Sequence, residues 1–148
     1  DKDLIYKSLL NSQDVCDLIL GSNSSDAFKN HYFNTLFVDT TQLEAKTYIA
    51  LDTIVPKADA KIKCIEIIMD VFCSLSLINL SSSEQAKFYK KGFFGNRIDV
   101  LIDVIKREIT DLDIGIGNVM LRPNNPISIV QPTDKHYGKR VIYQCYDF

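Results

Sequence analysis

The side chains with the clearest capacity for chemistry are three carboxylates in two stretches that should pair as strands: Asp52, Glu66 and Asp70. Acidic groups that converge on one face of a sheet can bind a divalent cation, which then activates water against a phosphodiester. Nucleases of the PD…(D/E)xK type also need a lysine two residues after an acid, and Glu66 is followed by Ile67 and Ile68 instead. A metal-dependent nuclease that uses these carboxylates is therefore the alternative, and a polar strip that faces solvent or a subunit is favoured.

The histidines and cysteines indicate no other reaction centre. His31 and His136 are the only histidines, and neither has a serine or cysteine nearby in a recognisable nucleophile motif. The cysteines form no Cys-x-x-Cys pair and no common zinc spacing, so we expect reduced thiols made in a cytoplasm. They are Cys16, Cys64, Cys73 and Cys145. We predict a protein that is not an enzyme and that binds neither a cofactor nor a metal.

The two stretches that would position the carboxylates have strong strand signals. TYIALDTIV alternates, and IKCIEIIMDVFC is rich in β-branched and aromatic residues. A turn over residues 56–61 would bring Asp52 near Glu66 on a mixed polar face. Tyr48 and Asp70 would lie near each other on the same face. The opposite, apolar face should contain Ile49, Leu51, Ile65, Ile67 and Met69.

Helices are expected before and after this hairpin. KDLIYKSLLNSQDVCDLILG predicts two short helices, with Ser12 as a cap and Gly21 as a stop. Asn96 caps a predicted helix over residues 97–110, and VMLR, ISIV and KRVIYQCYDF predict three further strands. This order favours an α+β fold, with a mostly antiparallel sheet of about 4–6 strands and helices packed on one face.

The predicted helix over 97–110 has apolar residues on two sides. At ~100° per residue, Val100 and Val104 lie roughly opposite the main apolar stripe, next to Asp99 and Asp103. The valines are either exposed, covered by a loop, or in contact with a neighbour. We predict that Val100, Val104, Asp99 and Asp103 form a subunit interface; in a host-cell adaptor, the valines would bind one protein. The main stripe, which should dock on the sheet, consists of Ile98, Leu101, Ile102, Ile105 and Ile109.

A loop over residues 131–138 is the second predicted contact. It is long for a hairpin loop, and long loops are often functional. It contains Lys135, His136 and Tyr137, with no reactive group paired to another. We therefore predict that these three residues contact a partner protein.

Length, charge and hydropathy limit the class of protein. The chain has 148 residues, 46% hydrophobic and 24% charged, which is typical of a single globular domain. Its net charge of −2 is unlike that of proteins that grip nucleic acid over a broad face. No apolar run approaches ~20 residues, so no membrane contact is expected. We predict one domain over 1–148, helical and loop-rich over 1–45, with the hairpin, helix and C-terminal strands over 46–148.

Several stretches together resemble the small neck proteins of tailed bacteriophages, most closely the tail-terminator or tail-completion group that joins head to tail. They are KTYIALDTIVP, the strand pair ending IMDVFC, FGNRIDVLIDVIKREI, GIGNVMLRPNNPISIVQP and the closing KRVIYQCYDF. The resemblance covers the chain from about Thr47 to Phe148. The resemblance rests on the order of these segments and on their general pattern of residues, because no invariant catalytic or binding residues define the group.

The resemblance implies an α+β protomer that assembles into a ring, typically a hexamer, in the neck of the virion after synthesis in the host bacterial cytoplasm. The implied partners are the tail-tube protein, the head-side connector or portal protein, and DNA that passes through the channel without sequence recognition. An acidic lining would let DNA slide, and Asp52, Glu66 and Asp70 are predicted to supply it. Another head–tail connector or stopper layer is the alternative to a tail terminator.

Overall fold

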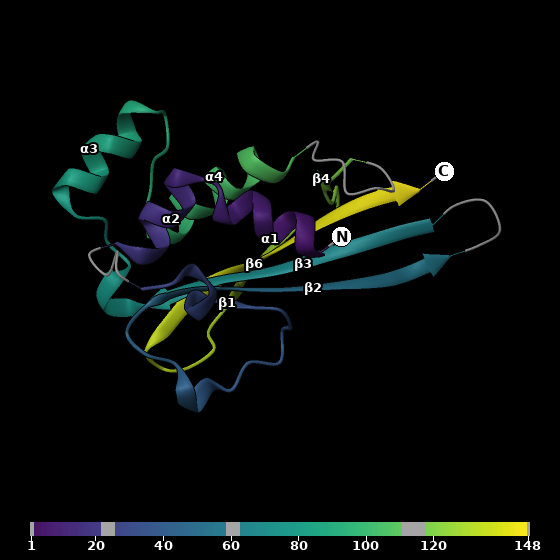
Figure 1. Cartoon of the computed structure of the whole chain (residues 1–148), viewed down its shortest axis with the longest axis horizontal. Helices are drawn as coiled ribbons and strands as arrows, with labels where there is room; N and C mark the ends of the chain where they lie inside the picture. Colours follow the sequence, from purple (N-terminus) through teal and green to yellow (C-terminus); the bar gives the residue numbers. More distant parts are fainter. Residues whose placement is uncertain (1, 22–25, 59–62, 111–117, 148) are drawn as a thin grey trace.

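In the part of the chain that the structure describes, the α-helices lie on one face of a six-stranded sheet (Figure 1). The computed structural model describes residues 2–21, 26–58, 63–110 and 118–147. The strand order is β1-β2-β3-β6-β4, and β5 also pairs with β6. Strands β1 and β2 are parallel, and all other pairs are antiparallel. The predicted α+β class with a mostly antiparallel sheet is confirmed.

The elements follow the order expected from the sequence. The α-helices are α1 (Lys2–Leu10), α2 (Gln13–Leu20), α3 (Ser82–Lys90) and α4 (Arg97–Ile109). The strands are β1 (Tyr32–Phe33), β2 (Thr47–Ala58), β3 (Lys63–Ser74), β4 (Met120–Leu121), β5 (Ile127–Val130) and β6 (His136–Asp147). Short 3-10 helices are η1 (Phe28–His31), η2 (Thr40–Gln42) and η3 (Leu75–Leu77).

The predicted helix ends are confirmed by side-chain geometry. The Ser12 hydroxyl accepts a hydrogen bond from the N–H of Val15 at 3.3 Å, which caps α2. Gly21 ends that helix with a φ of 53°, a value that glycine adopts without strain. The Asn96 side chain accepts from the N–H of Asp99 at 2.9 Å, which caps α4.

The β2–β3 hairpin is longer than predicted, and its register differs by two residues. Asp52 lies opposite Ile68 rather than Glu66. The turn expected over residues 56–61 is displaced, because β2 continues into that stretch after a pairing irregularity past Ile54. The turn itself lies outside the described residues. A shift of two residues preserves the alternation of side chains, so the two faces contain the residues expected.

The helix-covered face of the sheet forms the main core. Ile49, Leu51, Ile67 and Met69 are fully buried there, as predicted, and Ile65 is half-buried. This layer receives side chains from α1, α2 and α4 as well as from β6. The core therefore joins the N-terminal helices to the hairpin and to the C-terminal strand.

Helix α4 packs on both the sheet and the N-terminal helices, and this position corrects the predicted subunit interface. Val100 and Val104 are fully buried in the same core as Leu101. Arg107 follows Val100 by seven residues, so it lies on the same side of the helix, and its guanidinium bonds Asp14 of α2 at 3.0 Å. The two valines therefore face the N-terminal helices of their own chain.

The two apolar strips predicted on α4 are one continuous arc. At ~100° per residue, the arc runs from Val100 through Val104 and Leu101 to Ile102 and covers roughly 200°. Contacts with α1 and α2 on one side and with β3 and β6 on the other account for this width. A helix that touches two layers needs a wider apolar surface than a helix that covers one sheet.

The opposite face of the sheet has a smaller apolar cluster near one end. Tyr48, Ala50 and Phe72 are buried there, and the Tyr48 and Phe72 rings stack with centroids 5.6 Å apart. The segment over residues 33–43 covers them through Phe33, Leu36, Val38 and Leu43. Part of this mixed face is therefore a second core, and the part beyond it carries the charged residues.

Candidate interaction surfaces

The three carboxylates singled out from the sequence alternate on the expected face, but each is held by its own basic partner. Within the described ranges, no group of three or more His, Cys, Asp or Glu side chains is placed to hold a metal ion. The acid sites are therefore separate ion pairs, and they do not form the cation site that the nuclease alternative needs. The pairs are Lys2–Asp52 at 2.9 Å, Arg122–Glu66 at 3.2 Å and Arg140–Asp70 at 2.7 Å.

The Asp70–Arg140 pair belongs to a shallow groove on the same face. The guanidinium donates to both carboxylate oxygens of Asp70, at 2.7 and 3.0 Å, and Asp70 lies opposite Ala50 rather than Tyr48. The groove has a volume of about 290 Å³ and lies between residues 36–40 and 130–132. The surface predicted to be acidic is here a set of paired charges beside apolar side chains.

The predicted partner-contact loop is shorter than expected, because β6 begins at His136. His136 is buried: its Nδ1 lies 2.7 Å from Thr133 Oγ1, and its Nε2 lies 2.7 Å from the main-chain oxygen of Glu44. The carbonyl can only accept, so Nε2 donates. Tyr137 packs against the main core, and only Lys135 is exposed. The prediction is wrong for His136, which instead ties the loop to the segment before β2.

His31 is structural as well. It is 1% exposed, and its Nδ1 lies 2.8 Å from the main-chain oxygen of Thr47. Its Nε2 lies 3.2 Å from Asp26, which also binds Lys46 at 2.9 Å. Hydrogen bonds from Lys46 and then His31 hold the pKa of Asp26 below its usual value. The ring therefore joins η1 to the start of β2.

The acidic flank of α4 has two different environments. Asp99 accepts from the N–H of Asn96 and binds Lys139 of β6 at 2.8 Å, so it caps the helix and anchors it to the sheet. Asp103 is exposed, and Arg107, one turn further along α4, bonds Asp14 and Glu108. Of the four predicted interface residues, Asp103 is the one whose side chain faces solvent.

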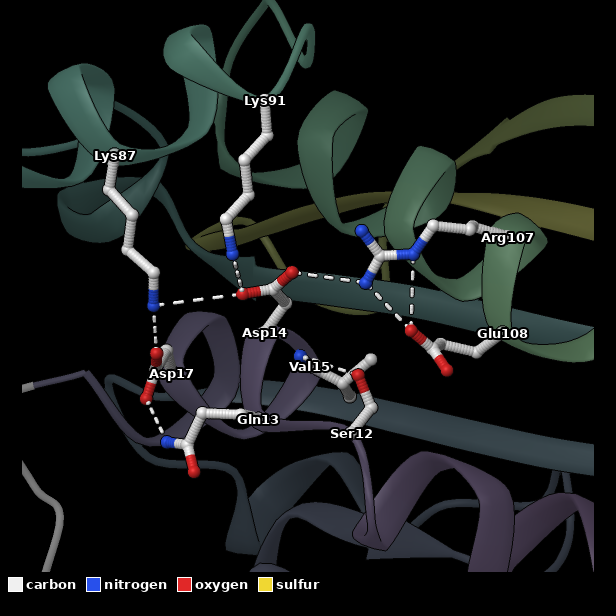
Figure 2. A network of polar contacts seen from close by, with 9 residues as sticks. All are labelled: Ser12, Gln13, Asp14, Val15, Asp17, Lys87, Lys91, Arg107 and Glu108. Carbon is white, nitrogen blue, oxygen red and sulfur yellow. Dashed lines mark hydrogen bonds and ion pairs between the residues drawn. The ribbon is translucent and has the colours of Figure 1, made fainter.

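A buried carboxylate on α2 organises the junction of α2, α3 and α4 (Figure 2). Asp14 accepts from Lys91 at 2.7 Å and from Arg107 at 3.0 Å, and Lys87 lies 3.7 Å away. Lys87 also binds Asp17 one turn further along α2. Burial alone would raise the pKa of Asp14, but the hydrogen bonds from Lys91 and Arg107 outweigh it and lower this pKa. Asp14 is therefore a charged centre that joins three helices.

The other end of α3 is held by a second ion pair. The Arg97 guanidinium donates to both Glu84 oxygens at 2.8 Å, and it also donates to the main-chain oxygens of Leu77 and Leu18. Burial raises the pKa of Glu84, but the hydrogen bonds from Arg97 and Ser81 and the charge of Arg97 together outweigh burial and leave this pKa below its usual value. A cleft of about 640 Å³ separates α3 from α2 and η3. Ion pairs and one buried ring, Phe88, thus fix this peripheral helix.

The Asp14 junction is not evident from the sequence alone. The donors lie 77 and 93 residues away in the chain, so no local motif joins them. One signal was available: Asp14 precedes the buried Leu18 by four residues and therefore lies on the apolar side of α2. An acid on that side needs buried partners.

Asp14→Asn is expected to destabilise the protein by about 1–3 kcal/mol, because the negative charge between Lys91 and Arg107 is lost and an NH2 group replaces one of the two acceptor oxygens. The lowered pKa makes the contribution of Asp14 present above the unfolded-state value of about 3.9 and lost as the pH falls through the folded value. Urea unfolding of both proteins should therefore show a constant difference near neutral pH and a shrinking one below about pH 4.

Asp3→Asn is the matched control, because Asp3 makes an exposed pair with Lys7. It should change stability by less than about 0.5 kcal/mol. An equal loss in both variants would mean that the Asp14 junction contributes nothing beyond surface charge.

Large apolar side chains are exposed at several places in the described part of the chain. Tyr89 and Phe94 lie next to each other at the end of α3, with ring centroids 5.1 Å apart. Ile127 and Ile129 lie on strand β5, at 47% and 70% exposure. In the described part of the chain, no disulfide joins any two of the four cysteines. Burial raises the pKa of Cys73 to about 11, so its thiol stays protonated.

These features define an α+β protein with a helical layer on one sheet face, whose polar side chains are organised as structural ion pairs. The chain belongs to the YomW family, whose model matches residues 2–145. This is a phage-derived family, named from a Bacillus prophage region, so the protein is phage-associated. No curated protein and no solved structure matches the chain. Among the described helices, none is long and apolar enough to cross a membrane.

Proposed function

We propose that the protein is a structural component of the phage virion, a tail terminator that forms a ring around the DNA channel. In this role it caps the tail tube and joins it to the head-side connector, and it carries out no reaction and needs no cofactor. The observation that carries the proposal is membership of a phage-derived family over nearly the whole chain. The resemblance of the hairpin, α4 and the C-terminal strands to neck proteins supports the choice of layer.

The surfaces of the molecule also support an assembling protein. Ile129 and Phe94 are 70% and 64% exposed, and each lies close to a second exposed apolar side chain, Ile127 and Tyr89 respectively. Clustered exposed apolar side chains are suited to contacts with other proteins, whereas single ones are common on any surface. Asp103 and Lys135 remain candidate contacts, because both are exposed. A ring around DNA does not need a strongly basic surface, and the paired charges of the outer sheet face would bind passing phosphates weakly.

Deletion of the gene from the phage is expected to give filled heads and separate tails of irregular length, with no joined particles. A tail terminator fixes the end of the tube, so its loss should affect both length and joining. Electron microscopy of lysates measures both properties, and a cryo-EM reconstruction of wild-type virions should place this chain as a ring, expected to be a hexamer, between tube and connector.

Expression of the gene in trans should restore joined particles. Tails of normal length together with heads that have lost their DNA would favour a stopper layer instead. Joined, infectious particles from the deletion phage, without this chain in the wild-type virion, would exclude a structural role.

A further inference from the structure

We infer that strand β5 is a self-pairing edge, which joins the β5 strand of a second copy of this chain about a two-fold axis. Within the part of the chain that the structure describes, β5 pairs only with β6, and its other side has no neighbouring strand. Its four residues, Ile127–Val130, carry no charge. Natural edge strands are usually protected by lysine, proline or a bulge, so an uncharged edge with exposed isoleucines is suited to pairing.

The backbone of β5 presents its hydrogen-bonding groups at two defined residues. The N–H of Ile142 on β6 donates to the main-chain oxygen of Pro126 at 2.8 Å. Successive residues of an antiparallel strand point their N–H and C=O groups to opposite sides. Ser128 is two residues after Pro126, so its backbone N–H and C=O groups also point toward β6. Ile127 and Ile129 consequently direct their backbone groups toward the open edge.

This arrangement is complementary to itself. In an antiparallel pair centred on Ser128, Ile127 faces Ile129 of the second copy, and Ile129 faces Ile127. Both positions have outward backbone groups, so each facing pair can exchange both of its N–H···O bonds. The register thus leaves no outward group of these residues without a partner.

The side chains agree with the same register. Ile127 lies opposite the buried Val141, so it shares the helix side of the sheet, and Ile129 shares that side because it is two residues along. The pairing therefore places the isoleucines of both copies together on one face. Lys139, the neighbour of Ile129 on β6, is already bound to Asp99, which removes like-charge repulsion across the axis.

The opposite sheet edge is less suited to pairing. Beyond the short strand β1, the N–H of Thr53 on β2 is taken by the Asp52 side chain at 2.8 Å, and Lys2 neutralises that carboxylate. This edge is protected by a side chain of the protein itself. Of the two edges of the sheet, the β5 edge of a second copy is therefore the better partner for β5.

A two-fold contact closes on itself, so it cannot build a ring of more than two subunits. The inference accordingly goes beyond the proposed neck function and does not depend on it. Four residues on each side bury a modest area, so the association should be weak and dependent on concentration.

The first test is sedimentation equilibrium of the purified chain over a wide concentration range. The wild-type protein is expected to shift from monomer toward dimer, and Ile129→Lys should abolish the shift. Ile54→Lys is the matched control, because Ile54 is 45% exposed on β2 and should leave the shift unchanged. An unchanged shift in Ile129→Lys, or a wild-type chain that stays monomeric throughout, would overturn the inference.

The second test is the register. In the proposed pairing, Ser128 of one copy lies opposite Ser128 of the second copy in a non-hydrogen-bonded pair. The Cα atoms of such a pair are about 4.5 Å apart, a distance that a disulfide can span. Ser128→Cys in a Cys16→Ser background should give a covalent dimer on mild oxidation, whereas Val130→Cys should give far less. Equal crosslinking at both positions would overturn the register, and pairing of β5 with a different virion protein instead of a second copy would overturn the occupant.

Discussion

The double substitution Val100→Glu with Val104→Glu is expected to abolish cooperative folding. Both valines are fully buried between α4 and the rest of the core, where two added carboxylates find no water. An unpaired buried charge costs several kcal/mol, and a domain of this size has only about 5–15 kcal/mol of stability. Far-UV circular dichroism and urea titration should therefore show a chain without a cooperative transition.

Two further variants show whether burial is the cause. Val104→Ala keeps the site apolar and should lose about 1–3 kcal/mol while the transition stays cooperative. Lys106→Glu adds a carboxylate on the exposed side of the same helix and should have little effect. A folded double variant with a native spectrum would show that these positions are accessible, as a subunit interface requires.

The subunit interface predicted at Val100 and Val104 was wrong because an apolar pattern predicts the buried positions of a helix but not the elements that bury them. The spacing identified every buried position of the main stripe, because periodicity depends only on local geometry. Val100 and Val104 appeared isolated because the pattern does not reveal how many layers surround a helix. That number depends on where α1 and α2 pack, which follows from contacts between distant parts of the chain.

The carboxylates on the sheet also show that a local pattern predicts the face on which a side chain lies but not its partners. Alternation in β2 and β3 was sufficient to assign Asp52, Glu66 and Asp70 to one face, because side chains alternate strictly along a strand. Their basic partners could not be predicted, since Lys2, Arg122 and Arg140 approach from α1, from the loop after β4 and from β6. Whether a group of acids binds a metal or forms ion pairs therefore depends on tertiary contacts.

The fold class could be predicted from local sequence signals, whereas the arrangement of the site could not. Caps at Ser12 and Asn96, the stop at Gly21 and the alternation of the hairpin are all local, and the structure confirms them. The predicted pairing of β2 with β3 was wrong by two residues. A turn sequence without a strict requirement permits several pairings, and those that differ by two residues leave every side chain on the same face. Edge strand β5 was predicted as a strand, but its open side depends on the order of the whole sheet.

Gly138→Ala is expected to destabilise the protein by about 3 kcal/mol or more, although it adds a single methyl group. Gly138 lies on β6 opposite Phe72, and a Cβ there would lie 2.0 Å from the main-chain oxygen of Val71 and 2.5 Å from the Phe72 Cα. The obstacle is backbone of the central strand β3, which cannot turn aside as a side chain can. Urea unfolding followed by circular dichroism measures the loss.

Gly21→Ala separates this steric effect from the conformational preference of glycine. Gly21 has a φ of 53°, but a Cβ there would meet nothing within 4 Å, so only the left-handed backbone is unfavourable, at about 1–2 kcal/mol. Shortening Phe72 should not rescue Gly138→Ala, since the nearest atom belongs to Val71. Recovery of stability in Gly138→Ala with Phe72→Ala would instead assign the clash to the aromatic cluster of the outer face. A loss no larger than that of Gly21→Ala would mean that β3 and β6 can separate locally, which the continuous pairing from Lys63 to Ser74 argues against.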